Sequence, residues 1–356
     1  MQVISIYKRR DGRFEGRVYL GKADNGKRRY KSYYGANEKE VIEKYAAEKT
    51  VTEPCLTKMT VKEMVREWLT SVVCRIKEST AANYRMKAEK HIIPSFGEID
   101  CGALKSKDVY AFINSKLSEG FSARYISDIV VLLKSVMKYA AHEYGINNVT
   151  DGISMPKKNS SQVRLLTDRE QTILKNHIDS CHDTTSLGAA FSLYMGMRIG
   201  EICALRWEDI DLEKRILTVS RTIQRIQTDD LNNKTKIVIS TPKSESSRRE
   251  IPIPERMMSF LREKNGKGNH YILTGSEKPL EPRSMQYRFA RLLKRLGLPS
   301  VHFHSLRHSF SCQALASGFD IKTLSELLGH GSTDLTLKFY AHSSLNRKIE
   351  CMKLIK

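Results

Sequence analysis

Two short motifs in the second half of this 356-residue chain contain residue types that bind phosphate groups. Arg198 and Glu201 are three residues apart in GMRIGEICALRW, and His304 and Arg307 are three residues apart in HFHSLRH. Residues three apart share a face of a helix, so each pair could act together on one anion. Either pair alone is more often a surface ion pair or a basic helix start, so neither motif by itself predicts a function.

A third motif adds a nucleophile to these anion-binding residues. His330 follows Leu-Leu-Gly, and Tyr340 lies ten residues further on in Phe-Tyr-Ala-His. A tyrosine hydroxyl can form a covalent intermediate, and a histidine can donate a hydrogen bond to a phosphate oxygen. A single tyrosine after an apolar segment is usually a core or surface residue, so the prediction depends on the order and spacing of all the motifs together.

That order resembles the tyrosine recombinases, the family that includes the integrases of phages and conjugative elements. The matching sequence runs from Arg-x-x-Glu through a lysine in a hairpin to His-x-x-Arg, Leu-Gly-His and Tyr-Ala-His, over residues 165–345. The resemblance implies a site-specific recombinase that cleaves and rejoins DNA through a 3′-phosphotyrosine. Such an enzyme integrates and excises a mobile element.

The resemblance also implies a role for each matching residue. Arg198 and Arg307 would hold the scissile phosphate, for which the planar guanidinium fork is well suited. His304 and His330 would donate to the same oxygens, and Tyr340 would be the nucleophile. Glu201 would orient Arg198 or a histidine rather than contact DNA.

The general acid of the family is a lysine in a hairpin turn before His-x-x-Arg. Lys243, in TPKSESSRR, is the favoured candidate, and Lys234 and Lys236 are nearby alternatives. A phosphotyrosine conserves the energy of the broken bond, so the resemblance implies a reaction that needs no cofactor, neither ATP nor a metal ion. Consistently, the sequence has no phosphate-binding glycine loop and no metal-ligand spacing.

The elements that position these residues predict a mainly α fold with small β elements (α+β). Residues 1–52 show three strands, at 3–8, 14–20 and 28–35, and then a helix capped by Asn37 with Glu40. Residues 57–150 are helical, starting with a capping box at Thr60 and continuing over 79–92, 105–119 and 122–143. Pro94 and Gly97 are expected to end the first of these three helices. A linker is expected at 147–163, and residues 163–356 form a third domain with a strand-rich insert at 216–253.

The basic composition favours a nucleic acid partner. The net charge is +20, and the first 35 residues contain ten Lys or Arg against three acids, interleaved with aromatic residues. This segment resembles an arm-type DNA-binding domain, although a charged face of a small cap domain has the same composition. The candidate DNA contacts are Arg9, Arg10, Arg13, Arg17, Lys27, Arg28, Arg29 and Lys31.

The helical segment 57–150 resembles the SAM-like domain that binds core DNA sites. Lys87, Lys90 and His91 could touch phosphates there, but a solvated helix face is the favoured interpretation for each. Leu345, Ile349, Met352 and Ile355 recur at helical spacing after Tyr340, and this apolar stripe is expected to pack either on a neighbouring protomer or on its own domain.

The resemblance implies a homotetramer on two double-stranded DNA sites, with an excisionase and a host DNA-bending protein as further partners. The N-terminal sequence lacks a signal peptide and no apolar run reaches membrane-spanning length, so a cytoplasmic protein is expected. Two alternatives remain at this point. A type IB topoisomerase uses a similar residue set but needs no paired sites, and a DNA-binding regulator that has lost catalysis would not form a covalent adduct.

Overall fold

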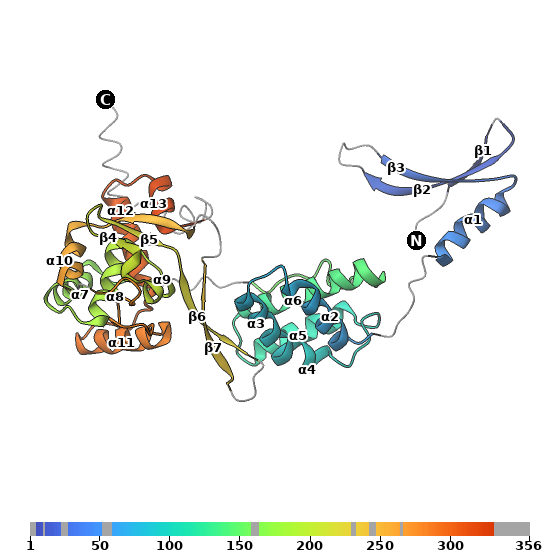
Figure 1. Ribbon diagram of the computed structural model, residues 1–356. Helices are drawn as coiled ribbons and strands as arrows, with labels where there is room; N and C mark the ends of the chain where they lie inside the picture. The colour runs from blue at the N-terminus through green and yellow to red at the C-terminus, as the bar shows by residue number, and fades with distance from the viewer. Residues whose placement is uncertain are drawn as a thin grey trace, which may run out of the picture. The chain divides into compact units, whose positions relative to one another are not determined.

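The computed structural model describes residues 5–9, 11–22, 28–51, 59–157, 164–228, 233–241, 247–263 and 266–330. The chain divides into two compact units, Met1–Asn159 and Ser160–Lys356, and the division lies within the segment expected to be a linker. Figure 1 shows the helices and strands of both units.

The first unit begins with a small antiparallel sheet of strand order β1-β2-β3 followed by one helix (Figure 1). Asn37 accepts a hydrogen bond from the Glu40 amide at 2.8 Å and so caps the helix. The helix covers one face of the sheet, where the rings of Tyr33 and Tyr45 lie 5.5 Å apart beside buried Val18. The expected arrangement of three strands and a helix is confirmed. The elements are β1 (Ser5–Lys8), β2 (Phe14–Lys22), β3 (Arg28–Gly35) and α1 (Glu38–Val51).

A helical bundle with its own apolar core follows. The expected capping box is present, because the Thr60 hydroxyl accepts from the Glu63 amide and the Glu63 carboxylate accepts from the Thr60 amide at 2.9 Å. The bundle consists of α2 (Val61–Val73), α3 (Glu78–Lys87), the π-helix η1 (Ala88–Ile92), α4 (Ile93–Phe96), α5 (Ser106–Ser118) and α6 (Ala123–Tyr144).

Two expectations for this bundle are wrong. Pro94 does not end the helix, because α3 continues through the π-helical turn into α4 and the chain leaves the helix only at Gly97. Pro94 comes directly after the π-helical turn η1, where the hydrogen-bond register of the helix changes and a missing amide proton can be tolerated. The expectation that Lys87 and His91 lie on a solvated helix face is also wrong, because they are 8% and 3% exposed. Lys87 Nζ lies 3.6 Å from Asp128, and His91 Nε2 lies 3.1 Å from the Tyr125 hydroxyl.

The second unit is built around α8, a helix that is buried over almost its whole length. Since α8 is apolar on most sides, it can pack simultaneously against α7, α9, α10, α11 and α12. The helices are α7 (Asp168–Ser180), α8 (Thr184–Met195), α9 (Ile199–Ala204), α10 (Glu255–Glu263), α11 (Pro282–Arg295), α12 (His304–Ala316) and α13 (Ile321–Leu328).

The strand-rich insert is confirmed, because its described residues form four strands. A short 3₁₀ turn and strand precede it. One antiparallel sheet has the order β4-β5-β8, and β6 pairs with β7 in a separate hairpin (Figure 1). These elements are η2 (Trp207–Asp209), β4 (Ile210–Asp211), β5 (Ile216–Val219), β6 (Thr222–Gln227), β7 (Thr235–Ser240) and β8 (Arg249–Pro252). The helices that the structure describes are all too short or too polar to span a lipid bilayer.

Candidate active site

Arg198 lies at the turn between α8 and α9, where it is the N-terminal cap residue of α9. Glu201, in the first turn, accepts from the Arg198 amide at 2.9 Å and from Arg198 Nη1 at 2.8 Å. The spacing of the two residues had suggested that they share one face of a helix. They meet instead across the start of α9. The Arg198 side chain remains 35% exposed, so a ligand can reach it.

Arg307 comes from α12 and is almost fully buried, at 2% exposure. Its Nη1 donates to the carbonyl of Gly196 at 2.8 Å, and its Nη2 donates to the carbonyl of Leu328 at 2.7 Å. Gly196 ends α8 with φ of 65°, and a Cβ there would lie 2.5 Å from the Phe310 ring. Glycine is needed at this position both for the left-handed backbone and for the close approach of α12.

The two histidines of the motifs belong to the same cluster. His330 follows α13, and its Nε2 lies 2.9 Å from Arg307 Nη2. Desolvation and the charges of Arg307 and Arg198 lower the pKa of His330 to about 4. His304 begins α12, where desolvation, Arg307 and His308 lower its pKa to about 4, with a smaller effect of Arg198. Both imidazoles are therefore neutral at neutral pH.

Arg249 is a member of the cluster that the sequence analysis missed. It begins β8, is 8% exposed, and binds Glu201 through Nη1 at 3.1 Å and Nη2 at 2.9 Å. Burial would raise the pKa of the Glu201 carboxyl, but Arg249 and then Arg198 outweigh it and lower the pKa to about 2. Period-two alternation was the available signal, because Arg249 and buried Ile251 share the inward face of β8.

The structure thus brings together the four described residues expected to act on the phosphate and the acid expected to orient one of them. The four are Arg198, His304, Arg307 and His330, and the acid is Glu201. Lys243 and Tyr340 lie outside the described residues. Three arginines and one ionised carboxylate leave the cluster with an excess of positive charge. Fixed guanidinium and imidazole donors around one exposed point are suited to a tetrahedral phosphate that gains charge in a transition state.

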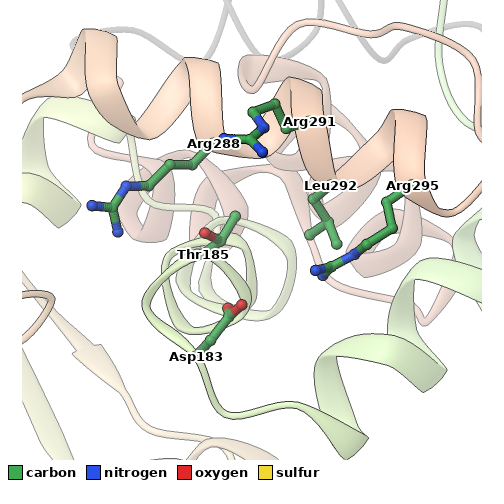
Figure 2. Close-up of a pocket in the computed structure, with 6 residues that line it drawn as sticks. All are labelled: Asp183, Thr185, Arg288, Arg291, Leu292 and Arg295. Atoms are coloured by element: carbon green, nitrogen blue, oxygen red, sulfur yellow. The ribbon is translucent and has the colours of Figure 1, made fainter.

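Two cavities of the second unit differ in their relation to this cluster. One, of about 530 Å³, lies between α11 and the segment before α12, and His304 lines it together with Arg283 and Tyr287. The other, of about 420 Å³, lies between the start of α8 and α11 and contains none of the cluster residues. Figure 2 shows that its three arginines, Arg288, Arg291 and Arg295, are spread along α11 and do not gather at one point.

The face of the N-terminal sheet that α1 leaves uncovered carries a second group of arginines. Glu15 lies at its centre, 2% exposed, and accepts from Arg17 Nε and from the Ser32 hydroxyl, both at 2.8 Å. The hydrogen bond from Arg17 lowers the pKa of Glu15 to about 2. The Arg17 guanidinium lies over the Tyr7 ring at 5.4 Å and that of Arg9 over the Tyr34 ring at 5.5 Å.

The other expected DNA contacts are distributed differently. Arg13 is exposed and bound to Asp11 at 2.8 Å, while Lys31 pairs with Val18 and by strand alternation shares the face that α1 covers. Arg28 and Arg29 are described only through the backbone of β3, and Arg10 and Lys27 lie outside the described residues.

With this geometry established, comparison with known sequences decides the family. Residues 163–347, slightly more than half of the chain, match the phage integrase family. This chain belongs to that family. It is a tyrosine recombinase, an enzyme that cleaves and rejoins DNA at specific sites. Residues 60–117 in addition match the N-terminal SAM-like domain of phage integrases.

Individual integrases and recombinases are similar over most of the chain. A tyrosine recombinase described as XerC-like, from Caldanaerobacter subterraneus, is 27% identical over 95% of this chain and 94% of its own length. The ICEBs1 integrase of Bacillus subtilis is 23% identical over 81% of this chain and 80% of its own.

The fold is that of solved integrase structures. The Tn1549 transposon integrase in complex with a circular intermediate DNA has a TM-score of 0.70 at 20% identity, covering 84% of this chain and all of the other. The lambda integrase tetramer bound to a Holliday junction has a TM-score of 0.60 at 19% identity, covering 94% of both chains. The mainly α fold with small sheets expected from the sequence is confirmed.

Proposed function

We propose that this recombinase integrates and excises a mobile DNA element through a 3′-phosphotyrosine at Tyr340. The observation that carries the proposal is the buried cluster in which Arg198, Arg307 and His330 meet at the end of α13. Its guanidinium groups are held by backbone carbonyls before any DNA arrives. Little reorganisation is then needed when the scissile phosphate binds.

In the proposed reaction, the Tyr340 oxygen attacks the phosphorus as its proton passes to water, and the bond from phosphorus to the 5′-oxygen breaks. Lys243 gives a proton to that oxygen, while Arg198, Arg307 and the two histidines stabilise the nonbridging oxygens. Rejoining reverses these steps, with a 5′-hydroxyl of the partner strand as the nucleophile. The phosphotyrosine keeps the bond energy, so the reaction is proposed to need neither ATP nor a metal ion.

We propose three domains with separate tasks. Residues 1–52 bind arm-type sites, residues 57–150 bind core sites, and residues 163–356 carry out catalysis. The proposal further includes a homotetramer on two DNA sites, an excisionase that sets direction and a host protein that bends DNA. The uncovered, arginine-bearing face of the N-terminal sheet supports the first of these tasks, and the tetrameric lambda integrase structure supports the assembly.

The test is a covalent adduct on DNA taken from the region that flanks the gene. Duplexes with a nick near each candidate site release a short strand on cleavage and so trap the intermediate. The wild-type chain is expected to form the adduct and Tyr340→Phe to bind the same DNA without forming it. An adduct formed by Tyr340→Phe would exclude Tyr340 as the nucleophile, and a wild-type chain that relaxes supercoils without pairing two sites would favour a topoisomerase.

A further inference from the structure

The C-terminal end of α13 offers three consecutive carbonyl groups to three different arginines. The carbonyl of Leu327 accepts from Arg249 Nε at 2.6 Å, and that of Leu328 accepts from Arg307 Nη2 at 2.7 Å. The carbonyl of Gly329 accepts from Arg198 Nη2 at 3.1 Å. The last carbonyls of a helix lack partners within the helix and carry the negative end of its dipole, so they attract cations.

Two of these arginines are expected to contact the scissile phosphate, but Arg249 is not. Its Nε is bound to Leu327, and its Nη1 and Nη2 are bound to Glu201, with Ser247 O as a further acceptor for Nη1 at 3.3 Å. The side chain is only 5% exposed, and these hydrogen bonds all go to protein atoms. Any effect of Arg249 on catalysis must therefore pass through the groups that it holds.

Glu201 is the group through which such an effect passes. The carboxylate is buried and is shared by Arg249, with two hydrogen bonds, and by Arg198. Without Arg249, the negative charge of Glu201 would be balanced by Arg198 alone. The cluster would lose one unit of positive charge, and Arg198 would be held to the carboxylate instead of facing a phosphate.

We propose that Arg249 is a positioning residue for DNA strand cleavage. It balances the charge of Glu201, so that the charge of Arg198 is directed to the scissile phosphate. Through Leu327 it also fixes the end of α13, from which His330 follows. This inference rests on the proposed role of Arg198 at the phosphate.

The test is a double-mutant cycle on cleavage of nicked core DNA by the full chain. Arg249→Gln is expected to cleave on the order of 10²-fold more slowly, the usual effect of losing one electrostatic contact in the transition state. Adding Glu201→Gln should restore part of this rate, because the neutral amide no longer competes for the charge of Arg198. Losses that simply multiply in the double variant would overturn the proposal.

Arg221→Gln is the matched control for the loss of an arginine–carboxylate pair. Arg221 binds Asp209 at 2.7 Å and 2.8 Å in the same unit and has no contact with the cluster among the described residues. Arg221→Gln should leave the cleavage rate within about threefold of wild type, the usual context-dependent scatter of a pair away from the chemistry. Arg249→Lys, which keeps the charge and loses the fork, should be intermediate and allows the test even if Arg249→Gln does not fold.

A substrate with a methylphosphonate at the scissile position separates positioning from general destabilisation. A methyl group replaces one nonbridging oxygen there, so the phosphorus centre is neutral and depends less on Arg198. Arg249→Gln and Arg198→Ala should both recover on this substrate, and a variant with a merely structural defect should not. If the wild-type chain forms no adduct, that result contradicts the proposed function itself. A wild-type adduct combined with no recovery of Arg249→Gln would overturn only the role of Arg249.

Discussion

Arg307 Nη2 donates a hydrogen bond to Nε2 of His330 at 2.9 Å, so this imidazole nitrogen is an acceptor and the ring proton is on Nδ1. Desolvation and then Arg307 itself hold the pKa of His330 down at about 4, which keeps the ring neutral at neutral pH. The free protein thus presents fixed arginine charges together with neutral imidazoles. A bound phosphate changes this balance, because its negative charge favours protonated histidine.

DNA binding should therefore take up protons at mildly acid pH. His304 and His330 both have pKa values near 4 in the free protein, and the scissile phosphate raises them. Since the protonated rings bind the anion better, affinity for core DNA should increase as pH falls from 7 to 5. The increase is limited to about tenfold per pH unit for each linked histidine. The affinity of Tyr340→Phe for core DNA is measured at each pH by fluorescence anisotropy at constant ionic strength.

The matched control for this pH dependence is a histidine of the second unit outside the cluster. His177 belongs to α7 and contacts Arg295 of α11, so His177→Gln should keep the wild-type pH dependence. The double variant His304→Gln, His330→Gln should lose most of it. An unchanged dependence in the double variant would mean that other groups take up the protons.

The sequence predicted the cluster residues because their types and order are local information, but it could not place them in space. Arg198 and Glu201 meet at a helix start and not along a helix, which depends on where α8 ends at Gly196. The three carbonyls of α13 that bind the arginines come into reach only when α8, α12 and β8 pack together. The sequence of α13 by itself contains no pattern that predicts these contacts with the arginines.

Other elements show where local rules are weaker than packing. Pro94 predicted a break, yet the π-helical turn just before the proline lets the helical run continue to Gly97. Lys87 and His91 are polar residues on a helix and were expected in solvent, but Asp128 and Tyr125 provide partners that allow both to be buried. Arg249 had a usable signal in the alternation of β8, which the motif-based interpretation did not use.

On the N-terminal sheet, Glu15→Gln should reduce sequence-specific binding while leaving non-specific binding the same or stronger. Glu15 orients Arg17 through Nε, and an oriented guanidinium can bind a guanine edge with its two terminal nitrogens. Specific affinity should fall by about tenfold, within the range for one such contact. Non-specific affinity should not fall, because the change removes a negative charge beside a polyanion. Specific affinity is measured with duplexes that the wild-type chain selects from a random pool. Non-specific affinity is measured with unselected duplexes.

Glu38→Gln is the control for the charge change alone. Glu38 is exposed in the first turn of α1 on the same small domain. Its replacement should strengthen binding to both probes slightly and equally. If Glu15→Gln behaves in the same way, Glu15 has no part in recognition and only the overall charge of the sheet matters.

Deleting residues 346–356 should weaken the pairing of two DNA sites more than binding to one site. The reason is the apolar stripe of Leu345, Ile349, Met352 and Ile355, which is proposed to pack on a neighbouring protomer and which lies outside the described residues. Native gels that separate single-site complexes from paired complexes measure both steps. Equal weakening of the two would indicate that the stripe packs on its own domain.

Lys243→Ala should cleave ordinary DNA slowly and recover on a substrate whose bridging 5′-oxygen is replaced by sulfur. The departing alkoxide needs a proton, and a positioned ammonium is expected to accelerate its loss by about 10²- to 10⁴-fold. A thiolate leaves without protonation, so the lysine is not needed for it. Arg307→Ala should gain little from the sulfur, because the missing charge acts on the nonbridging oxygens. If Lys243→Ala remains equally slow on the sulfur substrate, the proton comes from another group, and Lys234→Ala and Lys236→Ala are then to be measured on the same pair of substrates.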